Sequence, residues 1–138
     1  MRIKVGERGH VPTVGTEHSA GIDLASTIGV EITPNGWAEI KTHVTVEIPE
    51  GYFGLLCPRS SVGKKGLSLV NTIGIIDSDY RGEIIVLLKN NNNFGTRVEA
   101  GDRIAQLLIV PYLSPKIEVV EELTETVRGS GGFGSTGV

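Results

Sequence analysis

The chain has 138 residues, which is the length of one domain and enough to bury a core without disulfides or structural metals. Its net charge of −3 argues against broad affinity for nucleic acid, because such affinity requires a basic surface that neutralises phosphates. No apolar run is long enough to span a bilayer, and the N-terminus lacks the continuous apolar region of a signal peptide. We therefore expect no nucleic-acid or membrane partner. We expect a cytoplasmic location, or a nuclear or host-cell interior one if the source is eukaryotic or viral.

Short β-prone segments, separated by turn residues, run along most of the chain. Turn signals recur about every eight to twelve residues, a spacing typical of an all-β sandwich or barrel. The expected strands span residues 2–5, 20–25, 30–32, 37–41, 43–48, 52–57, 67–70, 73–76, 83–89, 96–98, 104–110 and 116–120. Helix is scarce: only 60–65 could make a helical turn, which we expect a serine to cap. We expect Trp37 and Leu55 to lie in the core.

Polar groups are concentrated in the stretch 71–83, which reads Asn-Thr-Ile-Gly-Ile-Ile-Asp-Ser-Asp-Tyr-Arg-Gly-Glu. Its flanks are rich in Val, Ile and Leu, so the local pattern favours a β-hairpin whose connection carries 77–82. The strands would supply rigidity and the connection would supply the chemical groups. Asp, Ser and Gly are also ordinary turn residues. Taken alone, the stretch therefore fits a plain polar turn as well as a binding site.

Three further polar clusters lie at the ends of apolar segments. Asp23 stands inside Ala-Gly-Ile-Asp-Leu, where a charge costs free energy unless it is paired or coordinates a ligand. The segment 58–66, Pro-Arg-Ser-Ser-Val-Gly-Lys-Lys-Gly, contains the guanidinium, hydroxyls, amides and lysines of a phosphate site, without the lysine spacing of a P-loop. The segment 101–106, Gly-Asp-Arg-Ile-Ala-Gln, is a turn that enters a strand with an isolated Gln106.

The last eleven residues, 128–138, differ from the rest of the chain, because five of them are glycine. We divide the chain into a β-barrel domain, 1–127, and a flexible glycine-rich arm, 128–138. An inert tail is the alternative, but a linker has no use for the Arg128 guanidinium or the lone ring of Phe133. We expect the arm to close over a nucleotide bound in the active site.

The spacing of residues does not match the motifs of several other classes of site. The calcium-loop pattern that begins at Asp77 has Arg81 and Leu88 at positions that need oxygen ligands. One cysteine and three scattered histidines have none of the spacings of a zinc site, and a serine hydrolase would need a Gly-x-Ser-x-Gly elbow. We expect Cys57 to be a small buried hydrophobe without a catalytic role.

Five segments in order resemble the five motifs of the homotrimeric deoxyuridine triphosphatases (dUTPases). They are 20–24, 58–61, Asn71 with 74–83, 101–106 and 128–137. Each motif is weak alone, but five in this order over nearly the whole chain are highly specific. The resemblance implies an all-β subunit, a jelly-roll or distorted β-barrel, with a flexible C-terminal arm. It also implies a homotrimer whose three active sites lie at subunit interfaces, each using motifs from all three chains.

The resemblance implies dUTP as the substrate and a role for each motif. Asn71 and backbone groups of the central hairpin would hydrogen-bond the uracil, and Tyr80 would lie against the deoxyribose where a 2'-hydroxyl would clash. The second and fourth motifs and the arm would hold the triphosphate, and Phe133 would stack on the base. The substrate-binding residues so implied are Arg59, Ser60, Ser61, Asn71, Gly74, Ile76, Tyr80, Gln106, Arg128, Phe133, Gly134, Ser135 and Thr136.

The resemblance further implies hydrolysis of dUTP to dUMP and pyrophosphate, which keeps uracil out of DNA and supplies dUMP for thymidylate synthesis. Asp77 would orient and deprotonate a water for in-line attack on the α-phosphorus, with Mg2+ as the cofactor that bridges phosphate oxygens. Asp23 would act on the metal indirectly, through its bound water, or would orient a neighbouring arginine. Asp79 and Glu83 would have structural or supporting roles.

Two alternatives to dUTP hydrolysis stay open. A dCTP deaminase belongs to the same superfamily, but its chemistry would call for a different polar set. A non-enzymatic module that senses a nucleotide or a protein partner could keep the trimeric jelly roll. Such a module would have no need of both Asp77 and the arm.

Overall fold

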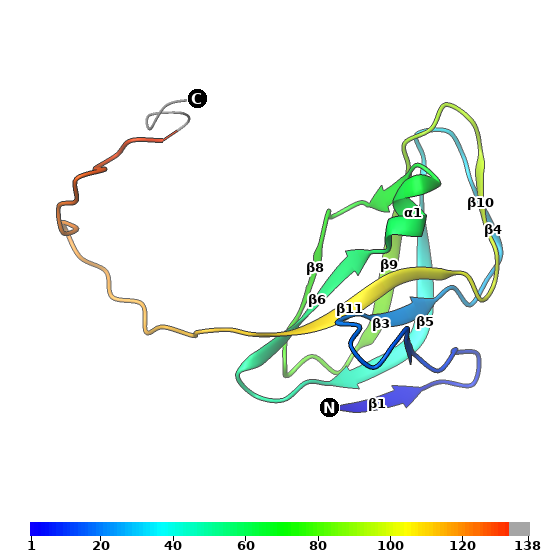
Figure 1. The fold of residues 1–138 in the computed structure, drawn as a ribbon, viewed down its shortest axis with the longest axis horizontal. Helices are drawn as coiled ribbons and strands as arrows, with labels where there is room; N and C mark the ends of the chain where they lie inside the picture. The colour runs from blue at the N-terminus through cyan, green and yellow to red at the C-terminus, as the bar shows by residue number, and fades with distance from the viewer. Residues whose placement is uncertain (133–138) are drawn as a thin grey trace.

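The computed structural model describes residues 1–132 and is built mainly of β-strands (Figure 1). The strands are β1 (Arg2–Val5), β2 (Thr13–Val14), β3 (Ile22–Ala25), β4 (Val30–Ile32), β5 (Trp37–Glu47), β6 (Tyr52–Pro58), β7 (Leu67–Leu69), β8 (Gly74–Ile76), β9 (Glu83–Asn90), β10 (Thr96–Val98) and β11 (Arg103–Pro111). Within these described residues the one helix is α1 (Ser60–Lys64). The predictions of an all-β fold and of a helical turn after β6 are confirmed.

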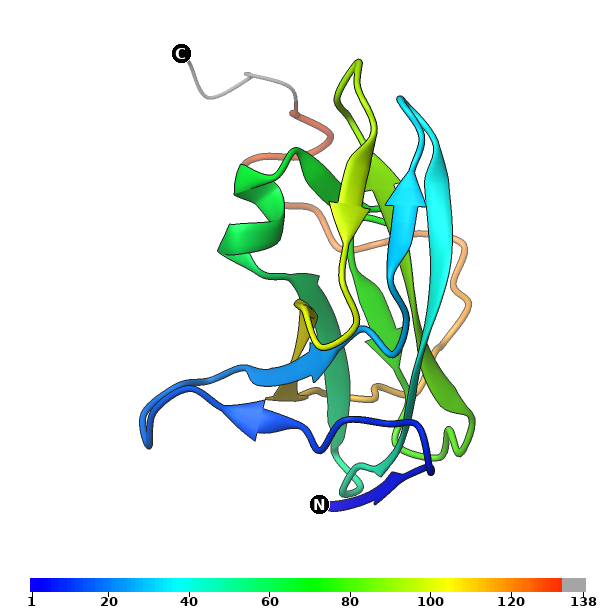
Figure 2. The same cartoon turned by 90° about the vertical axis from the view of Figure 1, so that its right-hand side faces the viewer.

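Two antiparallel sheets form the body of the molecule, which Figures 1 and 2 show from perpendicular directions. One sheet has the strand order β1-β5-β9-β7 and the other has the order β2-β3-β11-β6-β8. β4 and β10 pair separately as a two-stranded ribbon. Neighbouring strands come from distant parts of the chain, as in the predicted jelly roll.

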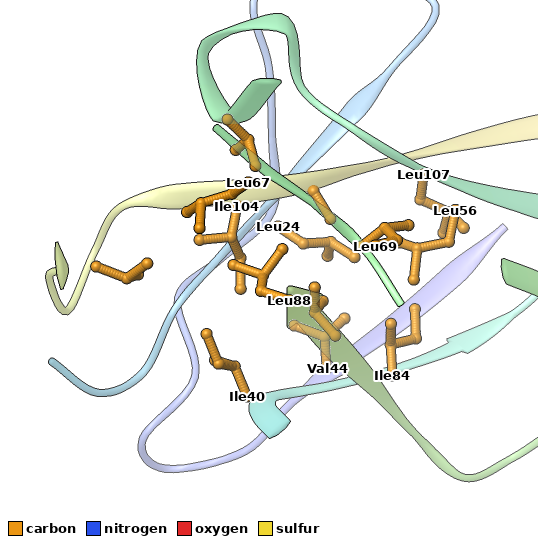
Figure 3. Packing of buried hydrophobic residues seen from close by; sticks show 14 of the residues in the cluster. Leu24, Ile40, Val44, Leu56, Leu67, Leu69, Ile84, Leu88, Ile104 and Leu107 are labelled. Carbon is orange, nitrogen blue, oxygen red and sulfur yellow. The ribbon is translucent and has the colours of Figure 1, made fainter. Parts of the chain in front are cut away.

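The core lies between the two sheets and follows the alternation of side chains along each strand. Ile40, Val86 and Leu88 of one sheet are fully buried, at 0% exposure. Leu24 and Leu107 of the other sheet are 1% exposed, and Figure 3 shows side chains from both sheets gathered in one cluster. Burying an aliphatic side chain of this size contributes about 1.5–3 kcal/mol relative to leaving it in water. A strand shifted by one residue would lose this contribution, so burial fixes the register.

Four local predictions are wrong. Trp37, expected in the core, is 60% exposed, because it takes an outward-facing position in the alternation of β5. Residues 116–120 are exposed and form no strand, because the chain beyond β11 leaves the sheets and has no neighbour with which to pair (Figure 1). The helix cap position is taken by Arg59, which makes no side-chain capping bond, and Ser60 is the first helical residue. Leu55 is half-buried rather than in the centre of the core.

The expected hairpin around 77–82 is also wrong. β8 pairs with β6 in one sheet, whereas β9 pairs with β5 and β7 in the other, so 77–82 cross from sheet to sheet. Close contact between β8 and β6 depends on glycine. A Cβ at Gly54 would lie 3.1 Å from the Ile76 Cβ, and one at Gly74 would lie 3.1 Å from the Leu56 Cβ. These two glycines let β8 join β6 instead of returning beside β9.

Asn90, at the end of β9, joins the loops at one end of the barrel. The side chain is fully buried, and its Nδ2 donates to the backbone oxygens of Ile32 at 3.0 Å and Phe94 at 2.8 Å. Its Oδ1 accepts from the Asn92 backbone N–H at 3.0 Å and from the Thr96 hydroxyl at 3.1 Å. One buried amide thus satisfies polar groups of three different segments.

We predict that Asn90→Ala lowers the free energy of unfolding by about 2–4 kcal/mol, because several buried polar groups lose their partner. Denaturant unfolding at fixed protein concentration measures the change. Asn93→Ala is the matched control, since Asn93 is exposed in the same loop. Equal stability of the two variants would contradict the structural role of Asn90.

Candidate active site

Asp23, Gln106 and Cys57 form a row on one face of the five-stranded sheet. Asp23 on β3 lies opposite Gln106 on β11, and Gln106 lies opposite Cys57 on β6. Residues directly opposite one another project from the same face of a sheet. Asp23 is 6% exposed and is the only buried carboxylate among residues 1–132. A charge in that position needs partners.

Two arginines supply those partners. The Arg59 Nε lies 2.7 Å from Asp23 Oδ1, and the Arg103 Nη1 lies 3.2 Å from Asp23 Oδ2. Arg59 follows β6 and Arg103 begins β11, so the pairing of β3, β11 and β6 brings all three groups together. Two guanidinium groups against one carboxylate leave a net positive charge at this end of the sheet, which suits an anionic ligand.

Gln106 is fixed beside this ion cluster. Its Nε2 donates to the Pro58 backbone oxygen at 3.2 Å. Its stem lies against Gly21, where an added Cβ would be 3.1 Å from the Gln106 Cβ. Gly21 therefore makes room for the Gln106 side chain.

A hollow of about 390 Å³ opens beside the arginines. Its polar lining consists of Arg59, Ser61, Lys65, Asp102 and Arg103. The Lys65 ammonium lies 3.1 Å from Asp102 Oδ2. A hydrogen bond from the Glu99 backbone N–H, together with Lys65, holds the pKa of the Asp102 carboxyl below its usual range. Asp102 thus ties the turn before β11 to the end of α1 as an ionised group.

A second cleft, of about 260 Å³, lies where the chain crosses from β8 to β9. It is lined by Ile75, Ile76, Asp77, Tyr80, Glu83, Ile84 and Ile85. Asp77 is exposed directly after β8, and the Tyr80 backbone N–H donates to its carbonyl oxygen at 3.1 Å. The Tyr80 hydroxyl donates to the Glu83 backbone oxygen at 3.0 Å. A cleft lined by four isoleucines, a tyrosine and two carboxylates can receive a flat ring and place an exposed carboxylate beside it.

The two half-sites lie at opposite ends of β6. Because β8 runs antiparallel to β6 and ends with Ile76 opposite Gly54, Asp77 follows at the Phe53 end of β6. Arg59 lies six residues further along the chain, a distance of about 20 Å on an extended strand. The carboxylate and the arginine cluster of one chain are therefore too far apart to act on the same phosphate.

The predicted site residues divide between these two places. The arginine end contains Asp23, Arg59, Ser60, Ser61 and Gln106. The β8 end contains Asn71, Gly74, Ile76, Asp77 and Tyr80. Arg128 lies in the exposed segment that leaves the barrel after β11, as Figure 1 shows. Phe133, Gly134, Ser135 and Thr136 lie outside the described residues.

Arg103 and Lys65 were not among the individually predicted site residues. The lysines of 58–66 were counted among the groups of a phosphate site, and Arg103 stands in the polar cluster 101–106, so their positive charges were a usable signal. What the sequence did not provide was the adjacency of β3, β11 and α1. That adjacency alone makes Arg103 a partner of Asp23 and Lys65 a partner of Asp102.

Residues 1–132 contain no cluster of three histidine, cysteine, aspartate or glutamate side chains arranged to hold a metal ion. In the same part of the chain, no helix is long and apolar enough to cross a membrane.

Comparison with known proteins identifies the family to which the chain belongs. The dUTPase family model matches residues 7–137. This chain belongs to the dUTPase family. It is 43% identical to the deoxyuridine 5'-triphosphate nucleotidohydrolase of Escherichia phage T5, over 99% of this chain and 98% of the phage protein. It is also 43% identical to the Arabidopsis thaliana protein of that name, over 98% of this chain and 81% of the plant protein.

Solved dUTPase structures share the fold. A dUTPase of Staphylococcus bacteriophage 80alpha with dUpNHpp has a TM-score of 0.91 and 34% identity, covering 99% of this chain and 98% of its own. A mutant dUTPase from phage phi11 of S. aureus, described with a structural Mg(II) ion, has a TM-score of 0.80 and 32% identity, covering 88% of this chain and 96% of its own. The predicted dUTPase fold is confirmed.

Proposed function

We propose that the protein is a dUTP diphosphatase that hydrolyses dUTP to dUMP and pyrophosphate. The observation that carries the proposal is the exposed Asp77 carboxylate in an isoleucine-lined cleft that also contains Tyr80, in a dUTPase-family chain. The two relatives at 43% identity are named deoxyuridine triphosphate nucleotidohydrolases. Hydrolysis of dUTP keeps uracil out of DNA and provides dUMP for thymidylate synthesis. We place this work in the cytoplasm, or in the nucleus or host-cell interior.

The β8 end is proposed to select the nucleoside. Uracil would enter beside β8, with backbone groups of Gly74 and Ile76 and the amide of Asn71 as hydrogen-bond partners. Fixed groups of this kind reject cytosine, whose donors and acceptors are exchanged, and a narrow cleft rejects the methyl group of thymine. Tyr80 would lie against the deoxyribose, where a 2'-hydroxyl would clash.

The arginine end is proposed to hold the phosphates. Arg59 and Gln106 are already fixed by Asp23 and by the backbone, so they lose little conformational entropy on binding. Ser60 and Ser61 stand exposed at the start of α1 and can donate their hydroxyls to phosphate oxygens. The arm would add Arg128, Gly134, Ser135 and Thr136, and Phe133 would stack on the base.

The donor set fits Mg2+ bound chiefly by the substrate. Both oxygens of Asp23 lie within 3.2 Å of an arginine nitrogen, so this carboxylate is proposed to reach the ion through water. Mg2+ usually keeps several waters and takes few protein ligands when phosphates are present. When bound, the ion neutralises charge on the phosphate oxygens.

Asp77 is proposed to be the catalytic base. Its carboxylate would accept a proton from a water placed in line with the α-phosphorus, and the leaving group would be pyrophosphate. The α-phosphate must then lie next to Asp77. Since Arg59 of the same chain is about 20 Å away along β6, another subunit would supply the arginine end. A homotrimer with shared active sites meets this requirement.

A panel of nucleoside triphosphates with Mg2+ tests the proposal through pyrophosphate release. We predict release from dUTP, with little from dCTP, dTTP, dATP, dGTP or UTP. Ammonia released from dCTP would identify a deaminase instead. Binding of dUTP without release of any product would identify a binding module.

We predict that Asp77→Asn retains dUTP binding but loses about two to four orders of magnitude in kcat, because the general base is removed. Steady-state kinetics and calorimetric titration measure the two quantities. Asp79→Asn is the matched control, since Asp79 is an exposed carboxylate two residues away. Near-normal turnover of the Asp77 variant would contradict its assignment.

A further inference from the structure

β5 contains a bulge where it pairs with the start of β9, directly after the 77–82 connection. β5 and β9 pair at Lys41 with Ile85 and next at Thr45 with Glu83, so β5 advances four residues while β9 advances two. At the centre of the bulge, His43 has φ of 54°, in the left-handed region that non-glycine residues seldom adopt. A conformation of this cost persists only where surrounding contacts hold it.

Two side-chain bonds hold the bulge to β9. The buried Thr42 hydroxyl donates to the Ile84 backbone oxygen at 2.7 Å. The Glu83 carboxylate accepts from the His43 backbone N–H at 2.6 Å. The Glu83 side chain is 27% exposed, and a short bond to an ionised acceptor in a partly buried place is among the stronger kinds. The first residue of β9 is thus bound through its side chain to a rigid feature of β5.

The backbone of the same residue holds Tyr80. The Tyr80 hydroxyl donates to the Glu83 carbonyl oxygen at 3.0 Å. The ring crosses over Gly82, where any Cβ would overlap the phenol. Tyr80 is 42% exposed, and the hydroxyl bond to Glu83 is the one side-chain hydrogen bond that its ring makes within residues 1–132. The Glu83 carboxylate, bound to the His43 N–H, thus holds the Glu83 backbone in place. The Glu83 carbonyl oxygen in turn holds the Tyr80 hydroxyl.

We infer that Glu83 is a positioning residue for sugar selection: its carboxylate, bound to the His43 bulge, holds Tyr80 where the ring excludes a 2'-hydroxyl. The inference rests on the proposed function, because it requires Tyr80 to face the deoxyribose. It gives Glu83 a specific role, beyond the structural or supporting one expected from the sequence. Released from the bulge, the start of β9 could move, and a ring displaced by about 1 Å would change the rate by as much as a hundredfold.

The test is the ratio of kcat/KM for dUTP to kcat/KM for UTP. We expect Glu83→Ala to lower this ratio by about tenfold or more, mainly by admitting UTP. Glu83→Gln keeps an oxygen that can accept from the His43 N–H, so it should retain most of the ratio. Glu31→Ala, which removes an exposed glutamate from β4, should leave the ratio unchanged. An unchanged ratio in Glu83→Ala would overturn the inference.

A double-mutant cycle separates positioning from general loss of stability. Tyr80→Phe removes the hydroxyl that donates to Glu83 and should itself lower the ratio. If Glu83 acts through Tyr80, adding Glu83→Ala to Tyr80→Phe lowers the ratio little further. Losses that multiply independently would overturn the inference.

If Glu83→Ala does not fold, Glu83→Asp takes its place, because the shorter carboxylate cannot keep the bond to His43. A lowered ratio in this variant supports the inference, and an unchanged ratio overturns it. The unmodified protein distinguishes a failure of the proposed function from a failure of this inference alone. If it releases no pyrophosphate from dUTP, the function is wrong. If it does so selectively while the Glu83 variants keep the ratio, only the inference is wrong.

Discussion

The arrangement of the site depends above all on the length of β6 and on the two strands with which it pairs. This strand pairs with β11 on one side and β8 on the other, so both half-sites are attached to it. Its extended backbone places Arg59 about 20 Å from Asp77. No rearrangement of side chains closes such a gap, and breaking the strand would cost the core beneath it. The fold therefore places two half-sites at opposite ends of one strand, and under the proposed function they form one site only between subunits.

Each half-site is prepared by a different kind of interaction. At the arginine end, the buried carboxylate of Asp23 pairs with both Arg59 and Arg103. Removing the carboxylate would leave two guanidinium groups facing each other in a partly buried place, which is unfavourable. At the other end, backbone hydrogen bonds and apolar walls shape the cleft beside Tyr80. In the proposed function, ion pairs thus hold the side chains that would bind phosphate, and the shape of the cleft would select the nucleoside.

Much of this could be predicted from the sequence, because the turns and apolar alternation define most strands and the polar clusters stand at their ends. Several of the failures concern partners that are distant in the sequence. The pattern at 116–120 is that of a strand, but a strand needs a neighbour and none is available there. The 77–82 connection looks like a hairpin locally, yet glycines at 54 and 74 direct β8 to β6. For the same reason, Asp23 could be identified as a charge needing partners, while Arg103 could not be identified as one of them.

The central claim, that one active site draws Asp77 and Arg59 from different chains, is tested most directly by mixing two inactive variants. Homotrimers of Asp77→Asn and of Arg59→Ala should each have very low turnover. In trimers assembled from an equal mixture, about a quarter of the sites would receive an intact Asp77 from one subunit and an intact Arg59 from another. The account predicts recovery of dUTP hydrolysis to about that fraction of the unmodified enzyme. Mixed trimers as inactive as the separate variants would contradict it.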